Sequence, residues 1–465
     1  MKIRKNKRKT KKRKITGRLI KIILLITIGI ALALALVHTL IDLFSRDIFD
    51  LLIEHLEKKS GSTYLVQYDA VDIDFFHRKI VVSNLSIKPD PAAAAAAGKP
   101  GNKPVKMLID GFIPFLELDG IACFKLVFQG QFEADKLKLR GGNWSIYRSI
   151  KSGDKRLLFR STGAAILLSR VKTGPYFFFE SGEIILKEPT LFPPAGFYAH
   201  KAGRLRFTGS KSSASLSLYE MESRPRSREH RSAKERRHRA GWMSLKIDNL
   251  TCSGIDLKRL LQERRFYCRA ASIKHPRLII FKDRRVQPIP RKAAGKFPQQ
   301  WLRWLHELKI KIKIGKLDIS QGRLDYNEQK INEKKTGILF FTNLQAEITN
   351  ISNSPQVSVK NPSMSVTAEA RVMDKGLLKI KLATPINHKK NAFTLTGSLG
   401  EMDMRAFNAI LAPNVHVRID RGILDEMQFS VAGDNYSAGG KMRFLYRDLK
   451  VSLLKVAESG AHRKR

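Results

Sequence analysis

The sequence predicts a mostly β fold with a few helices, in which an N-terminal transmembrane helix precedes an elongated, curved antiparallel β-sheet. Three observations predict it. One uncharged run of twenty residues lies near the start, apolar and polar residues alternate over most of the remainder, and Gly, Asn, Pro and Ser separate the alternating segments. The 465 residues are enough for two or three ordinary domains or for one elongated domain.

The first element is a basic tail followed by a membrane anchor. Residues 1–21 hold twelve Lys or Arg and no acid, and residues 22–41 read IILLITIGIALALALVHTLI, long enough to span a bilayer as a helix. The positive-inside rule places the tail in the cytoplasm and the remaining chain across the membrane, which in a bacterium is the periplasm. The topology-setting basic residues are Lys11, Lys12, Arg13, Lys14, Arg18 and Lys21.

A cleaved signal peptide is the alternative for this segment. Ala31-Leu32-Ala33 and Ala33-Leu34-Ala35 both fit a small-x-small cleavage pattern. The apolar run continues past them to Ile41, and helical spacing of apolar residues follows over residues 42–60, which favours an uncleaved anchor with a membrane-proximal helix that ends at Gly61.

The body divides into two predicted β regions and a short tail. Residues 64–296 form the first region, with flexible loops at 88–105 and 222–240. Residues 297–456 form the second, opened by a helix around Trp301–Leu308 that passes into a strand at Ile310, and residues 457–465 are a basic tail. A further short helix is expected at Met404–Leu411, closed by Pro413. The clearest strand alternates Met364, Val366, Ala368, Ala370 and Val372 with polar residues.

The net charge of +44 invites a nucleic-acid interpretation, but its distribution argues against one. Apart from the N-terminal tail, the main basic cluster is the 222–240 insertion, which has no interleaved aromatic residues to stack bases. We expect no nucleic-acid partner. The insertion instead fits an anionic lipid or lipopolysaccharide surface, with a solvated loop as the alternative. The candidate contacts are Arg224, Arg226, Arg228, Arg231, Arg236, Arg237 and Arg239.

No constellation in the sequence indicates catalysis, a metal or a cofactor, so we expect a protein that is not an enzyme. GxSxG, Walker, HExxH and GxGxxG patterns are all missing. Asp72 and Asp74 share one face of a predicted strand, where they fit a wet face better than an acid–base pair or a cation site. Trp301 and Trp304 fit core packing better than a membrane-interface anchor. Three separated cysteines, Cys123, Cys252 and Cys268, fit buried free thiols, although Cys252 and Cys268 could pair in an oxidising compartment.

Several stretches resemble the AsmA-like family of Gram-negative envelope proteins. VQYDAVDIDFFHRKIVVSNLSI (Val66–Ile87) is similar to the opening strand pair, and LKIKIKIGKLDISQGRLDYNEQ (Leu308–Gln329) with FFTNLQAEITNISN (Phe340–Asn353) is similar to the strands that begin a new layer. Residues Phe407–Leu454 resemble the closing module of a subgroup common in Bacteroidetes-like bacteria. The motifs are diffuse strand patterns, and relatives in the subgroup continue farther than this chain.

The resemblance implies an inner-membrane protein whose periplasmic body assists outer-membrane assembly or lipid homeostasis, by binding or transferring phospholipid along an apolar sheet face. Its partners would be the inner membrane, phospholipid and other envelope proteins. Whether the apolar face lines an open groove or packs on a core stays open. Two alternatives remain: an envelope scaffold without lipid binding, and, more distantly, a membrane-tethered nucleic-acid-binding protein.

Overall fold

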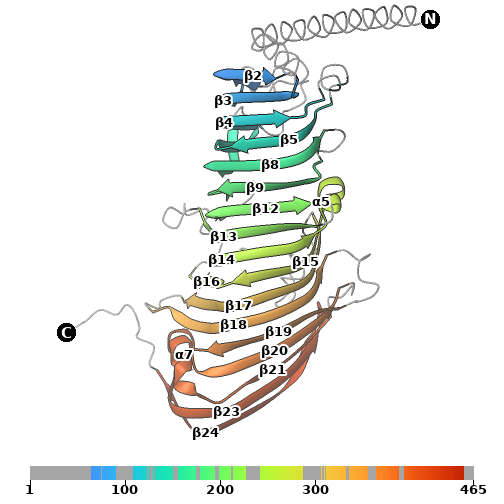
Figure 1. The fold of residues 1–465 in the computed structure, drawn as a ribbon. Coiled ribbons are helices and arrows are strands. Elements are labelled where there is room, and N and C mark those ends of the chain that lie inside the picture. The colour runs from blue at the N-terminus through green and yellow to red at the C-terminus, as the bar shows by residue number, and fades with distance from the viewer. Residues whose placement is uncertain are drawn as a thin grey trace, which may run out of the picture.

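The described part of the chain forms one sheet of 24 strands with two α-helices and one 3-10 helix (Figure 1). This computed structural model confirms the mostly β prediction. It describes residues 64–74, 76–90, 108–122, 125, 129, 131–149, 155–173, 178–193, 198–210, 213–226, 241–285, 305, 308, 310–330, 335–353, 363–386 and 392–454.

The strands of the N-terminal part are short, and they are listed here with their bounds: β1 (Tyr64–Gln67), β2 (Ala70–Asp74), β3 (Lys79–Pro89), β4 (Leu108–Asp119), β5 (Glu133–Arg140), β6 (Asn143–Ser149), β7 (Lys155–Ser161), β8 (Gly163–Lys172), β9 (Ser181–Lys187), β10 (Thr190–Leu191), β11 (Tyr198–Lys201), β12 (Arg204–Ser210) and β13 (Ala214–Pro225). The remaining elements are β14 (Gly241–Ile255), α5 (Leu257–Glu263), β15 (Arg265–Lys274), β16 (Arg277–Asp283), β17 (Lys311–Gln329), β18 (Gly337–Ser352), β19 (Ser363–Val372), β20 (Gly376–Pro385), β21 (Phe393–Leu399), β22 (Met402–Asp403), η3 (Met404–Phe407), α7 (Asn408–Val415), β23 (Val417–Gly433) and β24 (Ala438–Leu453).

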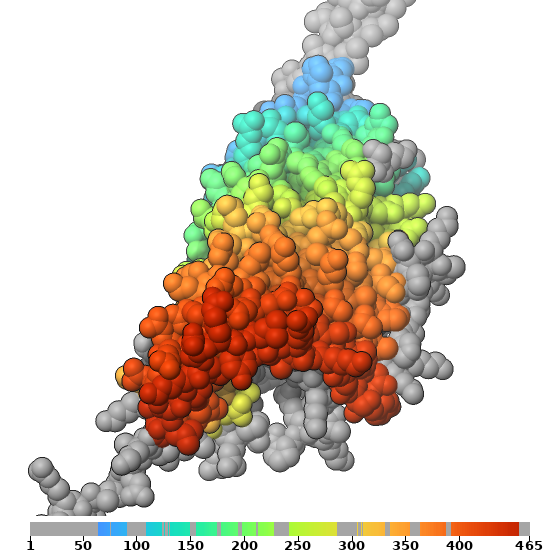
Figure 2. All heavy atoms as spheres, turned by 90° about the horizontal axis from the view of Figure 1, so that it is seen from below, coloured from blue at the N-terminus to red at the C-terminus, as the bar shows by residue number. Residues whose placement is uncertain are grey.

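The strands stack one after another across the long axis of the molecule, from β2 at one end to β24 at the other (Figure 1). Seen along that axis from the β24 end, the C-terminal strands form an arch over a hollow (Figure 2). The alternation of apolar and polar residues along the chain explains why these segments form strands. In β19, Met364 and Ala370 are buried while Ser365 and Glu369 are exposed, as expected for a strand with one sheltered and one wet face.

The sheet is split lengthwise in its N-terminal part. β4 pairs through residues 115–119 with β5 and through residues 108–112 with β6. Two columns of short strands follow, β5–β8–β9–β12 and β6–β7–β10–β11, and both end on β13. The long strands β4 and β13 therefore hold the two columns side by side.

A second split explains the only departure from the predicted antiparallel order within the described part. β15 and β16 run in line, separated by His275 and Pro276, and both pair antiparallel with β14. β17 then pairs with both, and both of these pairings are parallel. The prediction of a purely antiparallel sheet is wrong here because β17 follows β16 across a long connection instead of a hairpin turn.

Several predicted boundaries need correction. The loop predicted at 88–105 cannot begin at residue 88, because β3 continues through Pro89, and the loop predicted at 222–240 overlaps β13, which continues through Pro225. Both strands end at a proline, which lacks the N–H that further pairing would need. The strand expected to start at Ile310 begins at Lys311.

The helices also differ from prediction. Pro413 does not close the helix but lies inside α7, which ends at Val415. The proline omits only one helical hydrogen bond, and contacts of α7 with β18 and β23 keep the last turn in place. Helix α5 was not predicted. Its N-cap is Asp256, whose carboxylate accepts a hydrogen bond from the Arg259 N–H at 3.0 Å.

Other predictions lie outside the described residues. They are the basic tails 1–21 and 457–465, the anchor 22–41, the helix 42–60, and Trp301 and Trp304. Within the residues that the structure does describe, no helix combines the length and the apolar character needed to cross a bilayer.

Candidate functional site

The main feature of the sheet is an unbroken row of apolar residues that crosses seventeen strands, which we call row 1. Residues directly opposite in a β-ladder point to the same face, so the pairing register traces the row from strand to strand. Its members, from β2 to β24, are Val71, Val82, Leu116, Leu139, Ile166, Ile184, Phe207, Leu216, Cys252, Ala271, Leu317, Ile348, Val366, Leu382, Leu395, Val431 and Gly440.

A second apolar row, row 2, runs beside it on the same face. It starts on β8 and consists of Ala164, Leu186, Leu205, Leu218, Leu250, Ile273, Ile319, Ala346, Ala368, Ile380, Gly397, Phe429 and Met442. Neither row contains a charged side chain. We call the surface that carries them the apolar face.

From β12 to β24 the reverse side of the sheet is polar along the same line, whereas the corresponding residues on β8 and β9, Ala165 and Ile185, are apolar. Between the two rows, but pointing the other way, lie Arg206, Ser217, Thr251, Ser272, Asp318, Glu347, Thr367, Lys381, Thr396, Ser430 and Lys441. We call this side the polar face. A trough of about 1070 Å³ runs along the sheet from β17 to β24, and its lining alternates between residues of row 2 and residues of this polar line. The two faces thus differ in chemistry over a distance of one residue.

Parts of the apolar face form buried clusters. Near β3 and β4 the cluster is built on Val82, Leu139 and Ala164. In the middle, Cys252 and Ala271 pack with Leu257 of α5, and towards β24 a further cluster packs with η3 and α7. Between these covered areas the members of row 1 on β18 to β21 are only half-buried.

An apolar cavity of about 480 Å³ opens on this less covered part. All of its lining residues are apolar: Leu305, Leu308, Ile348, Ile351, Met364, Val366 and Leu382. Three of them, Ile348, Val366 and Leu382, belong to row 1. Pockets for small ligands span roughly 300–1,000 Å³ and are mostly apolar. The cavity therefore has the size and the chemistry to hold part of an apolar ligand.

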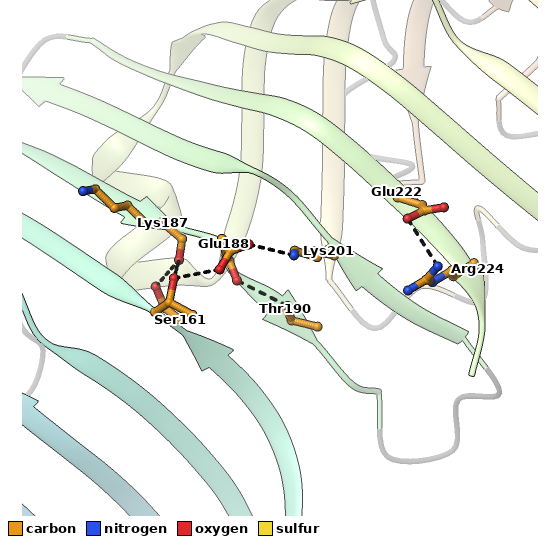
Figure 3. Close-up of polar contacts among 8 residues, drawn as sticks. Ser161, Lys187, Glu188, Thr190, Lys201, Glu222 and Arg224 are labelled. Carbon is orange, nitrogen blue, oxygen red and sulfur yellow. Dashed lines mark hydrogen bonds and ion pairs between the residues drawn. The ribbon is translucent and has the colours of Figure 1, made fainter. Parts of the chain in front are cut away.

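The predicted anion-contact residues are only partly described. Arg224 lies on β13 instead of in a loop, and its guanidinium is 3.8 Å from Glu222, which offsets its charge (Figure 3). Arg226 follows the strand, and its guanidinium lies 4.8 Å from the centre of the Phe192 ring. The other five, Arg228, Arg231, Arg236, Arg237 and Arg239, lie outside the described residues.

A polar strip joins the two columns of the N-terminal part near β13. Ser161 is fully buried, and its hydroxyl lies 2.8 Å from the Lys187 carbonyl oxygen (Figure 3). Glu188 accepts a hydrogen bond from Lys201 at 2.8 Å, and this bond lowers the pKa of the Glu188 carboxyl. These hydrogen bonds occupy the Ser161 hydroxyl and the Glu188 carboxylate, so we assign the strip a structural role.

The residues considered for catalysis or redox chemistry occupy separate places. Asp72 is exposed on β2, and Asp74 accepts a hydrogen bond from the backbone N–H of His77 at 2.9 Å. Cys252 and Cys268 are both free and buried, as predicted, whereas Cys123 lies outside the described residues. The hydrogen bond between the two thiols, together with burial, raises the pKa of Cys268. Among the described residues no group of His, Cys, Asp and Glu is arranged to hold a metal ion.

Sequence reasoning found the alternation but not the rows. Alternation assigns each residue to one of two faces within its own strand, whereas a row depends on the register between strands. Register is fixed by turns and bulges, which the sequence pattern marks only weakly. Comparison of the chain with protein-family models and with curated proteins gave no match.

Proposed function

We propose that this chain is an AsmA-like protein of a bacterial envelope, anchored in the inner membrane, whose periplasmic sheet binds or transfers phospholipid along its apolar face. The observation that carries the proposal is row 1, which stays apolar through seventeen strands, while the reverse side is polar from β12 to β24.

The energetics favour acyl chains as the ligand. An apolar face in water is normally covered by a second layer of secondary structure. The described residues supply only α5, η3 and α7 as helical cover. An acyl chain on the uncovered part would gain about 0.8 kcal/mol for each CH₂ removed from water.

Transfer, as distinct from storage, requires similar binding at successive positions. Row 1 offers an aliphatic, aromatic or thiol side chain or a glycine at each of the strands that it crosses, and neighbouring strands are about 4.8 Å apart. A chain moving along the row would meet no charged side chain that has to be desolvated at each step. No reactive residue is needed for this activity.

A scaffold without lipid binding is the second candidate, and the buried clusters favour it locally. Under α5 the apolar face is filled by the protein's own side chains, including Leu257 and Ile255, which are 4% and 1% exposed. If the whole face were filled in this way, no lipid would enter it.

Photo-crosslinking distinguishes these candidates. A benzophenone amino acid is placed at Leu382 or Leu395 of row 1 in the full chain, and at the adjacent polar-face residues Lys381 or Thr396 as matched controls. Cells are grown with radioactive phosphate and irradiated. We expect a radioactive phospholipid adduct at Leu382 and Leu395 and much less at Lys381 and Thr396. Equal labelling on both faces, or none at the row positions, would reject lipid binding along the face.

Topology is tested separately, with alkaline phosphatase or a fluorescent protein that matures only in the cytoplasm fused after Leu454. The proposal requires an active phosphatase and a dark fluorophore. The reverse pattern would place the body in the cytoplasm and end the envelope proposal.

A further inference from the structure

Two arginines face each other directly across neighbouring strands of the N-terminal part. Arg148 of β6 is opposite Arg156 of β7 in the pairing register. Like charges directly opposite in a ladder destabilise the strand pair. Arg148 is exposed and Arg156 half-buried, so their charges are only partly screened by water.

A third arginine lies beside this pair. The N–H of Phe192 donates to the Leu158 carbonyl at 2.7 Å, which fixes Phe192 beside β7 two residues from Arg156. The guanidinium of Arg226 stacks on the Phe192 ring at 4.8 Å. Burial, and after it the positive charge of Arg156, lowers the pKa of Arg226. The positive charges of Arg226 and Arg156 therefore repel each other.

Among the described residues no acid forms an ion pair with any of the three. Ion pairs offset the charge of some other arginines of the sheet. Arg224 pairs with Glu222 at 3.8 Å, and Arg206 pairs with Glu183 at 2.7 Å. The group of Arg148, Arg156 and Arg226 therefore keeps a positive charge that no described carboxylate offsets through an ion pair.

We propose that Arg148, Arg156 and Arg226 form a binding site for a phosphate group. Three guanidinium forks offer paired N–H donors whose geometry matches phosphate oxygens. A bound phosphate would also remove the repulsion between Arg148 and Arg156. The phosphate could belong to a lipid headgroup or be free in solution. The site does not include the apolar face. The proposal of a phosphate site can therefore be tested independently of acyl-chain binding.

The test is calorimetric titration of the full chain in a neutral detergent, at constant ionic strength. Inorganic phosphate and the soluble short-chain lipid dihexanoylphosphatidic acid are the two probes. We expect saturable binding of at least one probe, weakened about tenfold or more by the double substitution Arg148→Gln and Arg156→Gln. The matched control is Arg443→Gln on β24, an exposed arginine at the other end of the sheet that has no ion pair within the described residues, and it should leave binding unchanged.

Thermal unfolding supplies a second readout that a simple loss of charge would not give. Phosphate should raise the unfolding midpoint of the wild-type chain but not that of the double variant. Without phosphate, Arg148→Gln alone should be at least as stable as wild type because it removes the repulsion.

Tighter binding of the lipid probe would identify a headgroup site, and equal binding of both probes a site for free phosphate. Unchanged binding in the double variant, an equal loss in Arg443→Gln, or no saturable binding would overturn the proposal.

Discussion

The N-terminal part of the sheet, β1–β13, and the C-terminal part, β17–β24, are built by different means. Between β4 and β13 the width comes from two columns of short strands. In the C-terminal part it comes from single strands of 16–19 residues, β17, β18, β23 and β24. Both constructions carry the same apolar rows, so the rows do not depend on strand length.

The difference shows in how each part bends. Long strands must curve within themselves. The two register shifts between β17 and β18 and the three between β23 and β24 include non-glycine residues with positive φ, such as Gln321 and Asp448. The columns can bend at the junction between them instead. We therefore expect the two parts to respond differently to the same kind of damage.

The largest effect is expected from cavities at fully buried leucines of the two parts. Leu424 of β23 is 0% exposed and Leu108 of β4 is 1% exposed, so Leu424→Ala and Leu108→Ala should each cost about 2–5 kcal/mol. Because the strands contact mainly their neighbours, each substitution should reduce hydrogen-exchange protection only in its own part. Leu377→Ala, at a side chain that is 39% exposed, is the control and should cost less than about 0.5 kcal/mol. Loss of protection throughout the sheet would show that the two parts unfold as one unit.

A matched pair of glycines sharpens the comparison. A Cβ at Gly182 of β9 would lie 2.5 Å from the Leu167 carbonyl oxygen, whereas a Cβ at Gly439 of β24 would meet nothing within 4 Å. Gly182→Ala should therefore destabilise by about 1–3 kcal/mol. Gly439→Ala should be neutral or stabilising by up to about 1 kcal/mol, because it restricts the unfolded chain. Urea unfolding of both variants checks this, and a similar loss in both would contradict the steric account.

Helix α5 lies between the two parts and tests their junction. Asp256→Ala removes the N-cap and should cost about 1 kcal/mol, while Asp256→Asn should keep most of the capping. Because α5 covers the cluster that contains Cys252 and Cys268, the alanine variant should also react faster with a thiol reagent. An unchanged reaction rate would show that α5 does not protect the thiols.

The smallest expected effects concern how stability depends on pH. One residue, Glu133, contributes on the acid side, and another, Tyr326, on the alkaline side. Hydrogen bonds from Lys125 and Lys172 lower the pKa of Glu133 to about 2, below the unfolded value near 4.3. Its contribution to stability is complete above that unfolded value and is lost as the pH falls towards 2. Glu133→Gln should flatten the acid side of an unfolding-versus-pH profile, and an unchanged profile would count against the ion pairs.

Tyr326 of β17 gives the alkaline counterpart. Burial and its hydrogen bond to Glu328, at 2.6 Å, raise its pKa to about 12, above the unfolded value near 10. The folded chain therefore holds this proton more tightly, and the contribution is lost as the pH rises from 10 towards 12. Tyr326→Phe should lessen the loss of stability in that window, measured by chemical unfolding between pH 9 and 12.

The sequence alone predicts which segments are strands better than how they pair. The alternation from Met364 to Val372 gives β19 and its sheltered face, because period two follows from strand geometry. The parallel pairing of β17 escapes prediction because partner choice is not a local property. Helix α5 escapes it because seven residues carry too few helical repeats to stand out.

The candidate sites show the same difference between local patterns, which the sequence predicts, and strand pairing, which it does not. The predicted anion contacts Arg224 and Arg226 prove to differ, since one is neutralised by Glu222 and the other stacks on Phe192. Arg148 and Arg156 become a pair only through the register of β6 and β7. The apolar rows likewise need the complete set of registers, so no window of the sequence reveals them.

The stacking of strands nearly in chain order has a consequence for how the sheet is made. Apart from the side-by-side columns, each strand pairs with one that precedes it closely in the chain, so short loops close first and the entropy cost of each step is small. The sheet can be laid down one strand at a time, beginning at the N-terminal end. Removing whole hairpins from the β24 end, such as β23 and β24, should then leave a shorter sheet with its remaining rows intact, which makes length an adjustable property of this architecture.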